Sequence, residues 1–349
     1  MRTSRSVFTG LSFALVTSLA ALVACGGAEP TPATPESTSA AASTSATPVA
    51  STAATASATP APVTQEAVVP TPPPAVYKLI APGADPKTAL RYKLASMKDQ
   101  DGLFDIRMSL QMTIEGKELP AVALPTMRAT MHFAALPLTA TGDLPLTFEI
   151  KNFEVLGDSK LPAEAIKGLK AEVAKANGLK GSSVITPRGQ NKEVVFEVPK
   201  DVDPKVQQMI ESLRQQIADL VVELPEEPVG KGAKWEKSGP LVAGGATVTQ
   251  TTAFTLVDAK GTTAHLKSDV SQTASAQDIN SPSLPPNTRV RLESIESKGT
   301  GDNTVDLAKF IGKATAKVTS KSVMKITSGD NAQSMQMLLN IELSTSAKK

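Results

Sequence analysis

Apolar and polar residues alternate in several segments of this chain, and that pattern limits the fold more than any other feature. From Ile106 to Ile114 every even position is apolar and every odd position is polar. The segments 314–326 and 335–343 place their apolar residues mainly at every second position as well. Successive side chains of a strand point to opposite faces, so each segment predicts a strand with one buried face. One-sided burial is typical of an antiparallel sheet with one face in water.

The same pattern predicts most of the remaining strands. Residues 88–156 read as four antiparallel strands, of which the first lies around Leu90–Met97. A turn at 99–102 follows this first strand, and a bulge is expected at Asn152, where the apolar phase slips by one position. We expect a hairpin of 182–186 with 194–198, a second of 248–256 with 263–273, a strand through Val290 and Leu292, and a final hairpin of 314–326 with 335–343.

Two segments have the period of a helix instead. The first, residues 161–177, has Pro162 near its first turn and ends at Asn177-Gly178. The second, residues 203–223, has Asp203 as its N-cap and Pro204 at its first position, and Pro225 stops it. Its apolar stripe is long: Val206, Met209, Ile210, Leu213, Ile217, Leu220 and Val221.

Together these elements predict an α+β fold. Because the strands share one dry face and the two helices are available to cover it, we expect a large curved antiparallel sheet packed against two central helices. Residues 76–349 would form a single domain of this kind. The layout resembles the half-barrel of lipid-binding and carrier lipoproteins, as an analogy of shape.

The N-terminus reads as a targeting signal. Arg2 and Arg5 precede an apolar run over residues 7–23, which ends in small residues before Cys25, the single cysteine. An uncleaved transmembrane helix is the alternative, but seventeen residues lie at the lower limit for a membrane span and no basic cluster follows. We therefore favour a secretory signal.

The stretch Leu22-Val23-Ala24-Cys25 resembles the lipobox of bacterial lipoproteins. That resemblance implies that residues 1–25 are a signal peptide with the lipobox cysteine, and that Cys25 becomes the new N-terminus with lipid, such as palmitate, on its sulfur and amine. Gly26, in place of aspartate, implies sorting to the outer membrane. The protein would then be held in the cell envelope by lipid, facing either the periplasm or the outside.

Residues 26–75 are almost wholly Ala, Thr, Ser and Pro. A segment without periodic large apolar side chains cannot offset the entropy of ordering its backbone. We interpret it as a disordered tether between the anchor and the domain.

Composition excludes some classes of protein. The formal charge of +2 is spread over acidic and basic residues, and aromatic residues make up only 3% of the chain. A nucleic-acid-binding protein would show a concentrated basic patch, so we expect no nucleic-acid partner. With one cysteine, committed to lipid, the domain cannot form an internal disulfide.

A second resemblance concerns the stretch from Pro225 to Trp235, which reads P-x-x-P-V-x-x-G-x-x-W. With the preceding Asp-Pro helix start and the strand start Leu124-Pro125-Thr126-Met127-Arg128, it is similar to an uncharacterised family of bacterial envelope lipoproteins. The resemblance implies a β-rich envelope domain and no particular chemistry. For Trp235 we favour a buried anchor of the core, since an indole contributes a large apolar area.

No catalytic, metal or cofactor constellation can be assembled from the sequence. His132 and His265 fall on the polar phase of strands, which favours exposed surface positions. The chain lacks a Cys/His cluster and a G-x-S-x-G elbow, and Glu226-Glu227 reads as a solvated turn. We expect no catalytic residue, no metal, no cofactor and no enzyme activity; the one site residue is Cys25, for lipid attachment.

The predicted dry face is rich in methionine: Met108, Met112, Met127, Met131, Met209, Met324, Met335 and Met337. Flexible, polarizable side chains suit an adaptable pocket for apolar ligands and equally suit an ordinary core. Two functions stay open. The first is a non-catalytic module that binds a lipid or other hydrophobic small molecule in the envelope. The second is a structural or interaction protein with a filled core.

Overall fold

The computed structural model describes residues 75–157, 160–197, 210, 213–214, 217–243, 245–279, 284 and 287–348. The predicted signal peptide, Cys25 and the tether up to residue 74 lie outside these residues. Within them, no helix combines the length and the apolar character that a membrane crossing requires.

The named strands belong to one antiparallel sheet of fifteen strands, counted over the described residues. Its main path runs β1-β9-β10-β11-β13-β14-β15-β2-β5-β6-β7-β8, while β3 and β4 pair with β2 and β12 pairs with β13. The first eight strands are β1 (Val76–Ala81), β2 (Gln100–Ile114), β3 (Lys117–Glu118), β4 (Val122–Ala123), β5 (Thr126–Ala135), β6 (Leu144–Leu156), β7 (Lys180–Ile185) and β8 (Asn191–Phe196). The others are β9 (Lys234–Ala243), β10 (Ala246–Lys260), β11 (Thr263–Ala274), β12 (Gln277–Ile279), β13 (Thr288–Asp306), β14 (Lys313–Ser328) and β15 (Asn331–Ala347).

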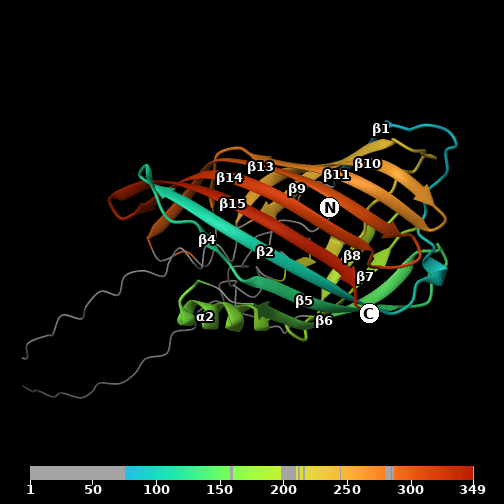
Figure 1. Cartoon of the computed structure of the whole chain (residues 1–349), viewed down its shortest axis with the longest axis horizontal. Coiled ribbons are helices and arrows are strands. Elements are labelled where there is room, and N and C mark those ends of the chain that lie inside the picture. Colours follow the sequence, from blue (N-terminus) through green and yellow to red (C-terminus); the bar gives the residue numbers. More distant parts are fainter. Residues whose placement is uncertain are drawn as a thin grey trace, which may run out of the picture.

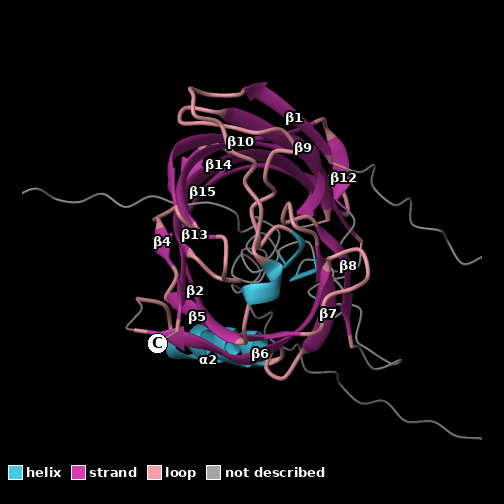
Figure 2. Ribbon diagram, turned by 90° about the vertical axis from the view of Figure 1, so that its right-hand side faces the viewer, coloured by secondary structure: helices cyan, strands magenta, loops and turns pink. Residues whose placement is uncertain are grey.

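The sheet is strongly curled. Its long strands run side by side across the molecule in Figure 1, and the view along the molecule in Figure 2 shows them surrounding an interior. The path begins at β1 and ends at β8, so these two strands are the edges of the sheet. The prediction of a large curved antiparallel sheet is confirmed.

The prediction of an α+β fold with two central helices is wrong. Strands dominate the fold, and the structure contains a single named α-helix in the described residues, α2 (Ala163–Ala174). It contacts β6 and lies at the margin of the sheet (Figure 1), where Asn177 Oδ1 accepts a hydrogen bond from the backbone N–H of Phe153. Among the residues of α2 only Val173 is buried, because its apolar stripe is too narrow to cover a sheet face.

The second predicted helix, 203–223, lies partly outside the described residues. Of its described part, Ile210, Leu213–Arg214 and Ile217–Ala218 have helical backbone, and the chain then continues without regular structure. Ile210, Leu213 and Ile217 are buried in the main hydrophobic cluster.

The predicted hairpins form as the alternation indicates. β14 pairs with β15 over its full length, with Ala316, Val318 and Met324 buried and Lys317 and Lys321 exposed. β7 with β8 and β10 with β11 are also antiparallel neighbours. The predicted bulge exists, since the β5–β6 register shifts between the pairs Thr130–Asn152 and Met131–Ile150.

The predicted first strand near 90–97 is absent. This stretch contains only the short 3-10 helix η1 (Leu94–Ser96), although Leu90, Tyr92 and Leu94 are all buried. The predicted turn at 99–102 is also wrong, because residues 100–102 belong to β2. The alternation in this stretch arises from a loop that packs over one end of the interior.

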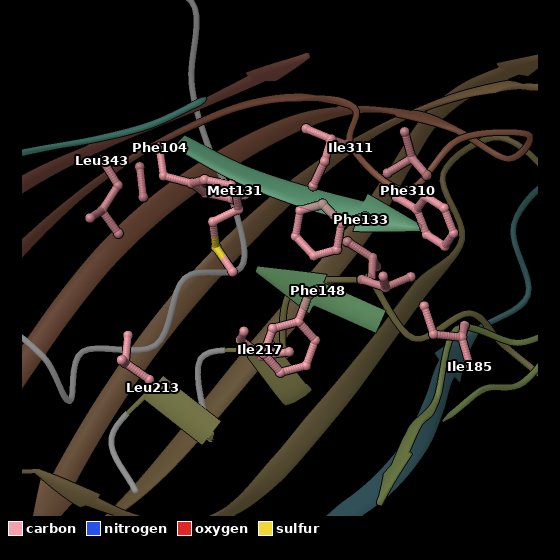
Figure 3. Packing of buried hydrophobic residues seen from close by; sticks show 14 of the residues in the cluster. Phe104, Met131, Phe133, Phe148, Ile185, Leu213, Ile217, Phe310, Ile311 and Leu343 are labelled. Atoms are coloured by element: carbon pink, nitrogen blue, oxygen red, sulfur yellow. The ribbon is translucent and has the colours of Figure 1, made fainter. Parts of the chain in front are cut away.

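The main hydrophobic cluster fills that end. Figure 3 shows its aromatic side chains packed together, with Phe133 stacked on Phe310 at 6.1 Å between ring centroids. The loops that cover it are tied to one another: Tyr92 N–H donates to Pro187 O, and Lys93 N–H donates to Leu307 O. We call this the loop-capped end. Two smaller clusters, around Leu292 and around Val248, lie towards the other ends of the same strands.

Candidate ligand-binding face

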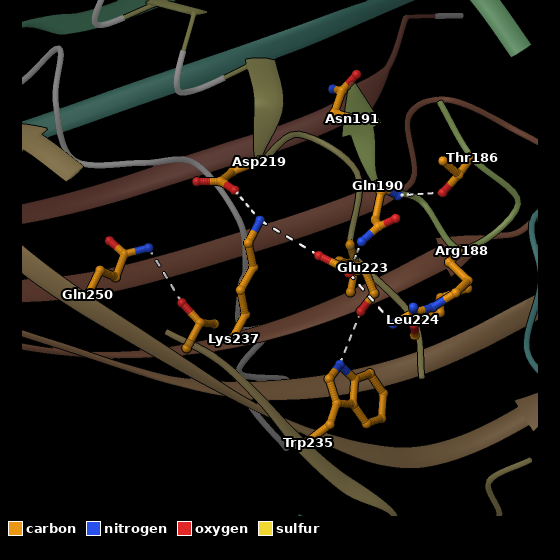
Figure 4. Close-up of polar contacts among 12 residues, drawn as sticks. Thr186, Arg188, Gln190, Asn191, Asp219, Glu223, Leu224, Trp235, Lys237 and Gln250 are labelled. Atoms are coloured by element: carbon orange, nitrogen blue, oxygen red, sulfur yellow. Dashed lines mark hydrogen bonds and ion pairs between the residues drawn. The ribbon is translucent and has the colours of Figure 1, made fainter. Parts of the chain in front are cut away.

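Residues 217–226, which we call the seam segment, connect the two edge regions of the curled sheet. On the side of β7 and β8, Asn191 Nδ2 donates to Ile217 O at 2.6 Å and Leu224 N–H donates to Arg188 O at 2.8 Å. On the side of β9, Trp235 Nε1 donates to Glu223 O at 3.1 Å (Figure 4). The segment therefore joins parts of the sheet that are not paired strand to strand.

Charged side chains strengthen this connection. The Glu223 carboxylate, whose side chain is 10% exposed, accepts a hydrogen bond from Gln190 Nε2 at 2.8 Å and lies 3.6 Å from Arg188 Nη2. Lys237 on β9 places its Nζ 2.7 Å from Asp219 Oδ1 and 4.0 Å from Glu223 Oε2. Burial alone would lower the pKa of Lys237, but the two carboxylates outweigh it and raise that pKa above its ordinary value.

The turn between β7 and β8 also reaches β1. The Arg188 guanidinium lies 5.1 Å from the centre of the Tyr77 ring, a cation–π arrangement. Burial, more than any charge nearby, raises the pKa of Tyr77, so the phenol stays neutral. Every charged group of the seam named above has a partner of opposite sign, which favours a structural role for this cluster.

Trp235 is fully buried, as predicted for a core anchor. Its indole stacks on Phe254 at 5.6 Å between ring centroids. In the predicted solvated turn at 226–227, the Glu226 side chain is 79% exposed and lies 3.5 Å from Arg188 Nη1.

The loop-capped end leaves little free space. A cavity of about 40 Å³ lies among Tyr92, Val222, Phe310 and Ile311. One water molecule occupies roughly 30 Å³ in the liquid, and drug-sized ligands need pockets of roughly 300–1,000 Å³. This cavity is therefore too small for a lipid.

Further along the inner face, a row of polar side chains crosses four strands. Gln250, Gln272, Ser297 and Ser320 are successive register partners on β10, β11, β13 and β14. Gln272 Nε2 donates to Gln250 Oε1 at 2.7 Å, and Ser297 Oγ donates to Ser320 Oγ at 2.9 Å. Gln272 is 1% exposed and Ser297 is fully buried. On these four strands this row, which we call the polar row, lies between residues of the main cluster and residues of the two smaller ones.

Ser322 follows two positions beyond the polar row on β14 and faces the same way. Its register partners are Ile295 on β13 and Met337 on β15. The side chain is 4% exposed and its hydroxyl has no hydrogen-bond partner in the described structure. An unsatisfied buried hydroxyl costs about 1–3 kcal/mol.

Beyond Ser322 the inner face becomes apolar and half-exposed. Met335 pairs with Ile114 on one side and with Met324 on the other, and Met337 pairs with Met112. Met324 is buried, whereas Met112, Ile114, Met335 and Met337 are intermediate in exposure. We call these five residues the methionine end. Of the other methionines of the predicted dry face, Met108, Met127 and Met131 belong to the main cluster, and Met209 lies outside the described residues.

The outer face of the sheet carries an open groove of about 540 Å³ over β9, β10, β11, β13 and β14. Its floor includes Ala253 and Gly299, and its charged side chains are two acids and two bases: Glu236, Asp269, Lys298 and Lys317. The groove is polar and carries no excess of either charge.

Both histidines lie on the outer side of strands and are partly exposed. His132 Nδ1 lies 2.7 Å from Asp101 Oδ1, and His265 Nε2 contacts Asp302 Oδ1. Over the residues that the structure covers, no group of three or more His, Cys, Asp or Glu side chains is arranged to hold a metal ion. The one predicted site residue, Cys25, lies outside the described residues.

The polar row and Ser322 were missed by sequence reasoning. In the sequence they are isolated serines and glutamines on the apolar phase of four separate strands. Their placement on a predicted dry face is the signal that could have revealed them, because buried polar side chains need hydrogen-bond partners.

No family model matches this chain, and no curated protein sequence matches it either. Among solved structures, OmpT, an outer membrane protein of Vibrio cholerae in its in-vitro folded trimer form, aligns over 70% of this chain and 99% of its own length, with 6% identity and a TM-score of 0.18. A score this low does not indicate a shared fold.

Proposed function

We propose that this chain is a lipid-anchored lipoprotein of the bacterial cell envelope that binds a hydrophobic ligand and catalyses no reaction. In this proposal Cys25 carries the lipid and residues 26–75 hold the domain away from the membrane. Gly26 after the cysteine supports the outer membrane as its location.

The observation that carries the ligand proposal is the methionine end. Four of its five side chains are only partly buried although they lie on the inner face of the sheet. Unbranched methionine side chains adapt to ligands of different shape, and contact with an acyl chain would remove their remaining apolar surface from water. The cavity at the loop-capped end is far smaller than a lipid, so we place the ligand at the methionine end.

The second candidate is a structural or interaction protein with a filled core. The packing of the loop-capped end and the open polar groove on the outer face favour it. In that case the groove would bind a partner protein and the inner face would bind nothing.

Native mass spectrometry separates the two candidates. The full chain carrying Cys25→Ser is purified from cells and its spectrum is compared before and after extraction with organic solvent. The ligand proposal predicts an extractable apolar molecule bound to the chain, and rebinding of an added fluorescent fatty acyl probe. A chain that carries nothing and does not bind the probe would favour the structural candidate.

The anchor has its own test. Metabolic labelling with an alkyne fatty acid is expected to label the wild-type chain. Cys25→Ser is expected to abolish the label and to leave the chain in an uncleaved or soluble form. A wild-type chain without label, or one whose mature N-terminus is not Cys25, would refute the lipoprotein assignment.

A further inference from the structure

The inner face places an unpaired hydroxyl directly beside the methionine end. Ser322 is only 4% exposed, and its neighbours across the strands are Ile295 and Met337. A buried hydroxyl normally has a partner in the protein or in a bound molecule. The position of Ser322 therefore indicates where a polar atom of a ligand would be received.

The polar row beside Ser322 contains no charged side chain. The polar row consists of two glutamines and two serines, which bond to one another in pairs. Their remaining hydrogen-bonding capacity suits an ester, amide or hydroxyl group.

The ammonium of Lys237, on the inner face of β9, is already neutralised. Lys237 is the register partner of Thr252 on β10, two residues from Gln250, and its Nζ lies 2.7 Å from Asp219 Oδ1. A carboxylate or phosphate of a ligand would have no free cation to pair with among these residues. Transfer of an unpaired anion into such a site is strongly unfavourable.

From these observations we infer that the ligand is an uncharged amphiphile, such as an acyl glycerol. Its hydrocarbon chain contacts the methionine end, and the carbonyl of its ester accepts a hydrogen bond from Ser322 Oγ. This inference rests on the proposed ligand-binding function and adds the chemical class of the ligand and the residue that selects it.

Competition binding tests the inference. The full chain carrying Cys25→Ser is loaded with a fluorescent acyl probe, which is then displaced by 1-monooleoylglycerol, by oleate or by 1-octadecene. We expect the uncharged ester to displace the probe at a concentration roughly tenfold or more below that of oleate, because the carboxylate must be desolvated without a cation.

Two variants locate the selective group. Ser322→Ala is expected to weaken the binding of 1-monooleoylglycerol roughly fivefold, which corresponds to the loss of one hydrogen bond. The binding of 1-octadecene should stay unchanged. The variant should fold normally, since it removes a hydroxyl that is unpaired in the protein. Ser271→Ala, in the groove of the outer face, is the matched control and should not change the concentration at which any of the three competitors displaces the probe.

The possible outcomes distinguish failure of this inference from failure of the proposed ligand-binding function. If all three competitors displace the probe equally, or Ser322→Ala weakens all three by the same factor, the inference is overturned while ligand binding stands. If the probe never binds, the ligand-binding function itself fails.

Discussion

Lys237 on β9 and Asp219 in the seam segment form an ion pair, with 2.7 Å between Nζ and Oδ1. The pair connects the sheet to a segment that lies outside every strand of the sheet. Both side chains are 31% exposed, so the pair is only partly shielded from water. The Glu223 carboxylate lies 4.0 Å from the same ammonium. The seam is thus held by charges as well as by backbone hydrogen bonds.

Removal of the ammonium should destabilise the protein. Lys237→Met leaves the carboxylates of Asp219 and Glu223 without their shared cation, and we expect the free energy of unfolding to fall by about 1–2 kcal/mol. Fully buried pairs typically lose about 3–5 kcal/mol when one partner is removed, but these side chains are partly exposed. Urea unfolding followed by circular dichroism measures it. Lys298→Met is the control; that side chain is 78% exposed on the outer face and should change stability by less than about 0.5 kcal/mol.

The contribution of Lys237 should also depend on pH. Its pKa is raised in the folded protein, so the stabilisation is fully present below the ordinary lysine pKa of about 10.4 and is lost as pH rises through the folded value. The stability difference between wild type and Lys237→Met should stay constant at neutral pH and shrink only above about pH 10.4. A difference that disappears already near pH 8 would show that another group is responsible.

Gly189 and Gly142 offer a matched pair of glycine substitutions. Both have positive φ, 84° and 80°. A Cβ at Gly189 would lie 2.6 Å from Tyr92 Cε2 and from Val222 O, whereas nothing lies within 4 Å of a Cβ at Gly142. Gly142→Ala should cost about 1–2 kcal/mol of backbone strain, and Gly189→Ala about 1–3 kcal/mol more because it pushes the seam segment away. Equal losses in thermal unfolding would contradict this close packing.

Trp235 contributes both a hydrogen bond and a large buried area. Trp235→Phe keeps a ring against Phe254 but leaves Glu223 O without its indole donor, and we expect a loss of about 1–3 kcal/mol. Trp235→Ala should cost more, about 3–5 kcal/mol. Chemical denaturation of both variants checks the order. If the two losses were the same, the ring of Phe would add no stability and the stacking would be unimportant.

The strands could be predicted from the sequence because their pattern is local. In β14 and β15 the buried residues fall at every second position, and no other element satisfies that period. The same reasoning failed at Leu90, Tyr92 and Leu94, since a loop that caps a core can bury alternate residues without strand pairing. Reasoning from the sequence also placed the helix at 161–177 against the centre of the sheet, although α2 buries too little apolar surface to lie there.

The candidate site could not be predicted because it depends on register between distant segments. Gln250 meets Gln272, and Ser297 meets Ser320, only after four strands have paired in the correct alignment. A shift of one residue would turn every one of these side chains to the outer face. The ion pair between Lys237 and Asp219 likewise depends on how the chain folds back from the seam segment into β9. No local sequence pattern specifies that path.

The most direct measurement of the central claim is to map where an apolar ligand touches the chain. A fatty acyl glycerol with a diazirine in its chain is photo-crosslinked to the full chain carrying Cys25→Ser, and the adducts are located by peptide mass spectrometry. Our account predicts adducts on the segments around Met112, Met324, Met335 and Met337. Adducts confined to the outer groove around Lys298 and Lys317, or none at all, would contradict it.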